Sequence, residues 1–176
     1  MEKTKKYFKP LMLLGIILVV VGCTNSEETG NSSEKSEGEQ NVRTVIEKLF
    51  TGPNKEQERM LDYSNEDFEK FAKSVSEYRK TFKPYLSENF FESFVNLAGP
   101  LRFLSMAHPN YELKVDDIKI EEKENYYEFT VKVSYTNSKS NQSKTKKVKG
   151  HAQTNEEGKV TSINYINAEE FRTALD

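Results

Sequence analysis

The sequence predicts an α+β fold, in which N-terminal helices of one domain pack on a bent four-stranded antiparallel sheet. Three observations predict it. Apolar residues recur with the 3.6-residue period of a helix as far as Leu97, and after His108-Pro109 they alternate with the two-residue period of strands. A Glu157-Gly158 pair then provides a hairpin turn. Helices followed by an antiparallel meander indicate α+β rather than βαβ units.

The first predicted helix begins at Asn41. Residues 42–50 place apolar side chains at i, i+3, i+4, i+7 and i+8, which is one face of a helix. Gly52-Pro53 ends this helix, and Asn54 caps a short second helix.

A longer third helix is predicted to follow a capping box at residues 64–67 and to end before Pro84. Ser87 caps a fourth helix, which Gly99-Pro100 closes. The aromatic side chains of this region are expected to form the core between helices and sheet: Phe68, Phe71, Phe90, Phe91, Phe94 and Phe103.

The strands follow from alternation. Residues 111–120 alternate with a slip at Asp116-Asp117, which predicts a β-bulge that bends the strand. Residues 127–135 alternate cleanly, and residues 160–166 form the last strand. The third strand carries Val148, Gly150 and Ala152.

The N-terminus has the pattern of a secretory signal over residues 1–22. Four lysines lie in the first ten residues, and residues 11–22 carry no charge. A helix of roughly 12 residues spans only ~18 Å, which is too short to cross a hydrocarbon core about 30 Å thick.

The signal ends in Val20-Val21-Gly22-Cys23, which resembles the lipobox of bacterial lipoproteins. The resemblance implies that the signal is cleaved before Cys23 and that its sulfur carries acyl chains such as palmitate. Two chains hold a protein stably on a bilayer. The expected localisation is the cell membrane of a Gram-positive bacterium, facing the extracytoplasmic side. The alternative is a buried cysteine in a signal that is cleaved elsewhere.

Residues 23–40 follow as an acidic tether. They are rich in Glu, Ser, Gly and Asn and have almost no apolar side chains, so we expect them to be disordered. Residues 41–176 are expected to form the single domain. The chain has a net charge of −2 and loses lysines with its signal, which excludes the charge balance of a nucleic-acid binder. Its single cysteine excludes an internal disulfide.

The order of elements gives a family resemblance. The stretches TFKPYLSENFFESF (residues 81–94) and VKGHAQTNEEGKVTSINY (residues 148–165) resemble small lipoproteins with a domain of the nuclear-transport-factor-2-like (SnoaL-like, cone-shaped) superfamily. The resemblance implies a cone-like fold over roughly residues 41–170. That superfamily includes enzymes and non-enzymatic binding modules, so the fold does not decide the function.

Few residues are candidates for catalysis. An enzyme of this shape would place His108 or His151 inside the cone. Asp116 and Asp117 are adjacent in a strand, where side chains point to opposite faces, unless a bulge turns both outward. No nucleophile elbow, phosphate-binding loop or metal-ligand spacing occurs, so we expect no cofactor and no metal.

Two sets of residues are candidates for binding. Tyr126 or Tyr165 could line an apolar pocket with some of the phenylalanines, or the tyrosines of the sheet could mark a surface that binds a partner. A basic segment at 137–149 contains Lys139, Lys144, Lys146, Lys147 and Lys149. These lysines would either contact lipid headgroups or an anionic wall polymer, or protect a hairpin against edge pairing.

Three functions remain open at this point. The first is a membrane-anchored, non-enzymatic accessory module that binds a partner protein, a peptide or a small apolar ligand. The second is a cone-fold isomerase or hydrolase that uses His108 or His151. The third is an envelope component that contacts wall polymer through the lysines. A closed, Phe-filled cone with an exposed tyrosine face would favour the binding module. A buried, ionisable His or Asp at the base of a pocket would favour the enzyme.

Overall fold

The computed structural model describes residues 35–62 and 68–176. The predicted signal, Cys23, most of the tether and the capping box at 64–67 lie outside the described residues. The helices are α1 (Glu37–Leu49), α2 (Lys55–Leu61), α3 (Phe68–Lys80), α4 (Glu88–Asn96), α5 (Arg102–Ala107) and α6 (Ala168–Leu175). The short 3₁₀ turns are η1 (Lys83–Tyr85) and η2 (Gly99–Leu101). No helix of the described part is long and apolar enough to cross a membrane.

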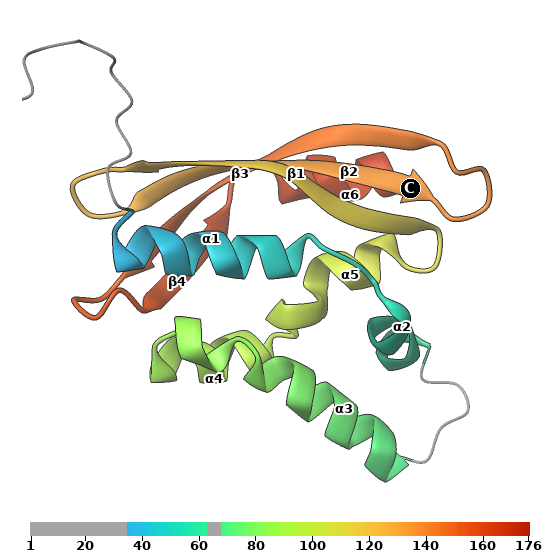
Figure 1. Cartoon of the computed structure of the whole chain (residues 1–176), viewed down its shortest axis with the longest axis horizontal. Helices are drawn as coiled ribbons and strands as arrows, with labels where there is room; N and C mark the ends of the chain where they lie inside the picture. The colour runs from blue at the N-terminus through green and yellow to red at the C-terminus, as the bar shows by residue number, and fades with distance from the viewer. Residues whose placement is uncertain (1–34, 63–67) are drawn as a thin grey trace, which may run out of the picture. The chain divides into compact units, whose positions relative to one another are not determined.

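Four antiparallel strands form one sheet in the order β1-β2-β3-β4, as predicted. They are β1 (Tyr111–Glu122), β2 (Tyr127–Asn137), β3 (Ser143–Thr154) and β4 (Val160–Tyr165). The register between β1 and β2 shifts between Val115 and Asp117, which confirms the predicted bulge. Figure 1 shows α1 and α5 next to the sheet and α3 and α4 further from it. Helices packed on one side of an antiparallel sheet confirm the predicted α+β fold.

The inner face of the sheet is set by β2. Its alternating side chains from Tyr127 to Tyr135 are buried. Three of them lie opposite residues of β3, namely Ala152, Gly150 and Val148. These are the residues that the sequence assigned to the third strand. The residues between them point to the outer face, which is solvated.

An aromatic cluster fills the space between this inner face and the helices. Phe50 of the α1 end stacks on Phe103 of α5 with ring centroids 4.1 Å apart. Phe171 of α6 meets Phe50 edge-on at 5.7 Å. Tyr165 of β4 meets Phe103 at 4.9 Å and Phe129 of β2 at 6.0 Å. The four phenylalanines are fully buried, so this part of the domain is packed rather than hollow.

The first helix begins before the predicted boundary at Asn41. It starts at Glu37, where the Ser36 side chain accepts a hydrogen bond from the Glu39 backbone N–H. Ser36 Oγ also lies 3.0 Å from the Tyr127 hydroxyl, which ties the helix start to the sheet. The last residues assigned to the tether are therefore part of the folded domain. Their acidic composition is typical of a disordered tether, but acidic residues are also favourable in the first turn of a helix, so composition alone did not reveal the capped first turn.

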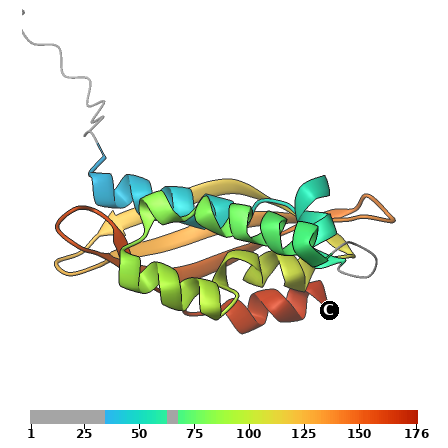
Figure 2. The ribbon, with the colours of Figure 1, turned by 90° about the horizontal axis from the view of Figure 1, so that it is seen from below.

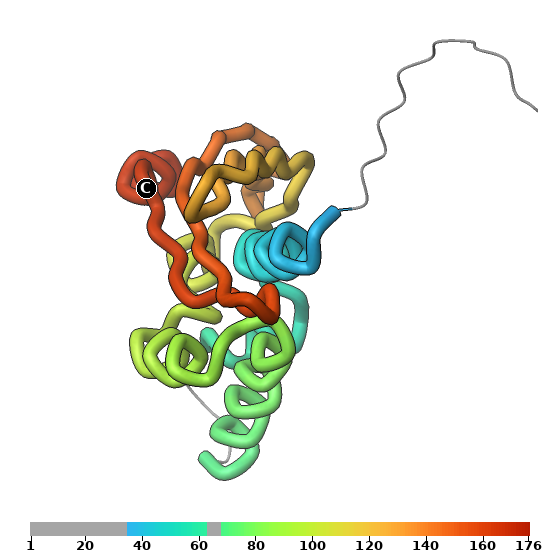
Figure 3. The backbone as a smooth tube through the Cα atoms, turned by 90° about the vertical axis from the view of Figure 1, so that its left-hand side faces the viewer, coloured from blue at the N-terminus to red at the C-terminus, as the bar shows by residue number. Residues whose placement is uncertain are grey.

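The third helix differs most from the prediction. Phe68 was expected in the core but is 66% exposed. Val75 is the one buried residue of α3, and Phe71 and Tyr78 are half-buried. In Figure 3, α3 points away from the sheet, and Figure 2 shows α3 and α4 in front of the sheet when viewed from below. The apolar face of α3 therefore packs on other helices only along part of its length.

Candidate functional site

The two histidines do not lie together. His108 Nε2 is 2.7 Å from the Asp62 carboxylate, beside the start of β1. His151 pairs with Glu128 on the outer face of the sheet and stacks against Tyr126 with centroids 4.7 Å apart. Glu128 of β2 lies opposite His151, and Asn137 of β2 lies opposite the start of β1, near His108. Roughly 30 Å of strand separates these two β2 residues. The outer-face position of His151 also separates it from the aromatic cluster.

Asp116 and Asp117 both lie in solvent, at the bulge. Asp116 accepts a hydrogen bond of 2.6 Å from the Ser134 hydroxyl and lies 3.7 Å from Lys132 Nζ. Its role is therefore to link β1 to β2 at the bulge. Within residues 35–62 and 68–176, no group of three or more His, Cys, Asp or Glu residues could hold a metal ion.

The lysines of the basic segment do not share one surface. Only residues 138–142 form the loop between β2 and β3, and the last four lysines of the segment lie within β3. Lys147 and Lys149 alternate with the inner residue Val148 and so lie on the outer face. Lys146 lies on the other face, 3.3 Å from Glu170 of α6. The predicted basic hairpin is thus divided between two faces of the sheet.

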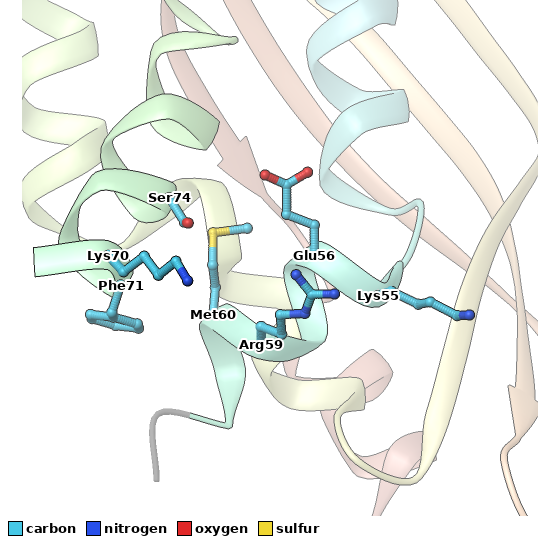
Figure 4. A pocket seen from close by; sticks show the side chains of 7 residues that line it. All are labelled: Lys55, Glu56, Arg59, Met60, Lys70, Phe71 and Ser74. Atoms are coloured by element: carbon cyan, nitrogen blue, oxygen red, sulfur yellow. The ribbon is translucent and has the colours of Figure 1, made fainter. Parts of the chain in front are cut away.

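A polar cavity of about 280 Å³ lies between α2 and α3. Figure 4 shows its lining, with the Met60 side chain between those of Lys70 and Arg59 and the Phe71 ring next to Lys70. Glu56 contributes a carboxylate to the same lining. Mixed charges of this kind are common on solvated helices, so they do not by themselves indicate a ligand.

An apolar cavity of about 130 Å³ lies between α4 and β4, which we call the α4–β4 cavity. Its lining comes from segments far apart in the sequence: Phe90, Ser93, Phe94, Leu97, Gly99, Arg102, Ile163 and Tyr165. The cavity borders the aromatic cluster, because Tyr165 belongs to both. Apolar walls with a few polar groups are the usual composition of ligand pockets.

The turn after α4 shapes one wall of this cavity. Ala98 adopts a left-handed conformation with φ 55°, which a residue with a Cβ rarely does. Gly99 follows, and a Cβ there would lie 2.3 Å from the Phe94 ring. The Tyr78 hydroxyl donates to the Pro100 carbonyl oxygen at 3.4 Å. The turn leaves Leu97 81% exposed at the cavity, an unusual position for a leucine.

Two polar groups belong to the cavity. Burial raises the pKa of the Tyr165 hydroxyl, while the nearby Arg102 guanidinium lowers it by a smaller amount. The hydroxyl therefore stays protonated and can donate a hydrogen bond. It has no hydrogen-bond partner among the described residues. Arg102 is exposed, and its guanidinium lies 5.7 Å from the centroid of the Tyr165 ring.

Of the predicted binding residues, Tyr165 lines this cavity and Tyr126 does not. Tyr126 lies instead in a polar recess at the β1–β2 hairpin, next to His151. Arg102 and Leu97 were missed. One signal for Arg102 was present, because it is the only Asp, Glu, Lys or Arg between Glu92 and Glu112.

Comparison with known proteins adds solved structures of low similarity. No protein-family model and no curated protein matches the sequence. A candidate polyketide cyclase from Xanthomonas campestris pv. campestris is similar with 9% identity and a TM-score of 0.42, over 79% of this chain and 99% of that one. The candidate transfer protein TraH of the Gram-positive conjugative plasmid pIP501 has 14% identity and a TM-score of 0.40, over 82% and 97% of the two chains.

A nuclear-transport-factor-2-like protein of unknown function from an Exiguobacterium species is also similar. It has 13% identity and a TM-score of 0.33, over 69% of this chain and 95% of that one. At these values the similarities say nothing about a ligand or an activity of this chain.

Proposed function

We propose that this chain is a lipoprotein, anchored by acylated Cys23 to the extracytoplasmic face of the cell membrane, whose domain is a non-enzymatic binding module. In this proposal the α4–β4 cavity holds an apolar group of the bound molecule. The observation that carries the proposal is the composition of this cavity, in which Phe90, Phe94 and Ile163 surround a space open to solvent. Such a site gains binding free energy from apolar surface removed from water.

The positions of the ionisable groups favour binding over catalysis. A general acid or base has to lie within hydrogen-bond reach of the reacting group. His151 lies on the outer face of the sheet, and His108 is engaged with Asp62. The inner face is filled by the aromatic cluster. The tyrosine of the cavity is held in its neutral form by burial, which suits a hydrogen-bond donor better than a base.

The anchor is tested by Cys23→Ala. Because the acyl chains would provide the membrane affinity, we expect this variant to appear in the medium or to accumulate with its signal uncleaved. The measurement is membrane fractionation together with the mass of the N-terminal peptide. A variant that stays in the membrane fraction at the processed size of the wild type contradicts the anchoring proposal.

The binding role is tested with benzene, a neutral probe that fits apolar cavities of this size. Methyl NMR of the full chain carrying Cys23→Ala is expected to show shifts at Leu97 and Ile163 when benzene is added. Ser93→Trp should abolish these shifts, because Ser93 lines the cavity and the larger ring would fill it. Asn96→Trp is the matched control, since Asn96 is exposed on the same helix and does not line the cavity. Unchanged shifts in Ser93→Trp would show that benzene binds elsewhere.

A further inference from the structure

Arg102 is a free cation beside the α4–β4 cavity. Its guanidinium lies 5.8 Å from the ring centroid of Phe103 and 5.7 Å from that of Tyr165, within the range of cation–π attraction. It makes no ion pair with an acidic residue in the part of the chain that the structure describes. Its N–H donors have no hydrogen-bond acceptor among the described residues. A planar set of donors of this kind matches a carboxylate.

The Tyr165 hydroxyl is a second hydrogen-bond donor of a residue that lines the cavity. Tyr165 lines the cavity together with Arg102, and its hydroxyl has no partner among the described residues. A carboxylate has two oxygens that accept hydrogen bonds, so one anion could satisfy both side chains. The charge and the donors beside this apolar cavity are therefore complementary to an apolar group that ends in a carboxylate.

The size of the cavity limits the apolar group. An apolar cavity of about 150 Å³ holds one benzene molecule. The α4–β4 cavity, at about 130 Å³, is somewhat smaller, so it takes one side chain of about leucine size and not a long acyl chain. Apolar surface continues outside it on Leu97, whose side chain is 81% exposed. A bound molecule with further residues beyond the buried one would contact this surface.

Building on the proposed function, we propose that the α4–β4 cavity binds the C-terminal residue of a peptide or protein. The apolar side chain of that residue enters the cavity, and its free carboxylate is held by Arg102 and the Tyr165 hydroxyl. The preceding residue lies against Leu97. The proposal assigns Arg102 to ligand recognition and distinguishes free C-termini from internal segments of a chain.

The test compares two N-acetylated peptides, Gly-Ser-Gly-Ser-Leu with a free carboxylate and the same peptide with a C-terminal amide. Titrated into the full chain carrying Cys23→Ala, the free acid is expected to bind at least about tenfold more tightly, because hydrogen bonds to charged groups are the stronger ones. Arg102→Gln should remove this difference, and Arg102→Lys should retain part of it. Arg172→Gln, which removes another exposed arginine, should leave the difference unchanged.

Equal binding of acid and amide, or a difference that survives Arg102→Gln, overturns the proposal. If benzene still shifts the cavity methyl signals in that case, the binding role stands and only the recognition of a C-terminus fails. If neither benzene nor any peptide affects the cavity, the proposed function fails as well. Two further probes distinguish the source of the carboxylate. Tighter binding of hexadecanoate, or binding of 4-methylpentanoate as tight as that of the peptide, would assign the site to a free carboxylic acid and overturn the peptide assignment.

Discussion

Replacement of Phe50 by alanine is expected to lower the free energy of unfolding by about 3–5 kcal/mol, the range measured for large-to-small changes of buried aromatic residues. Phe50 is fully buried and stacks on Phe103 with centroids 4.1 Å apart. It also meets Phe171 and Tyr165 edge-on. Its removal would leave a void between α1, α5, α6 and β4, and rigid rings on several sides prevent the neighbours from filling it. Urea unfolding followed by circular dichroism measures the change.

Phe68→Ala is the matched control. This substitution also removes a phenyl ring, but the Phe68 side chain is 66% exposed, whereas that of Phe50 is buried. We expect a change within about 0.5 kcal/mol, as for surface substitutions in general. A loss at Phe68 as large as that at Phe50 would mean that α3 is packed much more closely than the structure shows.

These two phenylalanines show what periodicity predicts and what it leaves open. Both fall on the apolar face of a predicted amphipathic helix, and Phe68 was expected in the core. The pattern identifies the face correctly, since Phe50 and Val75 are buried. It contains no information on whether a second element covers the whole face. For α1 the sheet does so, whereas α3 contacts other helices over only part of its length.

Short helices were also difficult to predict from the sequence. The sequence predicted the strands and the bulge because alternation over many residues is a strong signal. It did not predict α5 and α6, which have six and eight residues. Too few apolar positions repeat in elements of this length to establish a period. Both helices supply core rings. Phe103 was expected in the core, but Phe171 was not, so the sequence alone could not show how completely the inner face is filled.

The candidate site was predictable only in part, for a related reason. The α4–β4 cavity joins Leu97 to Ile163 and Tyr165, which are far apart in the sequence. Gly99-Pro100 correctly marked the end of a helix, but nothing in that dipeptide reveals the left-handed Ala98 that exposes Leu97. Tyr165 was identified as a pocket candidate because a tyrosine combines an apolar ring with a polar end. Its place beside Arg102 depends on tertiary packing.

Gly150→Ala is the second substitution expected to have a large effect. Gly150 pairs with Phe129 on one side and with Tyr165 on the other. A Cβ at this position would lie 2.3 Å from Phe129 Cζ and 2.4 Å from the Asn164 carbonyl oxygen. The Phe129 ring crosses the strand where other residues carry a side chain, and it is fully buried. Overpacking of this kind costs about 1–3 kcal/mol, and the clash with backbone places Gly150→Ala in the upper part of that range.

Gly38→Ala is the matched control for Gly150→Ala, because it adds the same methyl group to a different environment. A Cβ at Gly38 would meet chiefly the Tyr127 hydroxyl, at 2.6 Å, which is the end of a side chain rather than backbone. Alanine also favours a helix over glycine, by up to about 1 kcal/mol in a helix interior, which offsets part of the cost of moving that hydroxyl. We therefore expect the free energy of unfolding of Gly38→Ala to lie within about 1 kcal/mol of the wild-type value. Because Gly150 is paired with Tyr165, only Gly150→Ala should also shift the Ile163 methyl signal in the absence of a probe. Equal stability of the two variants would mean that β3 and β4 separate easily at Gly150, in which case the aromatic cluster would not hold the wall of the cavity in place.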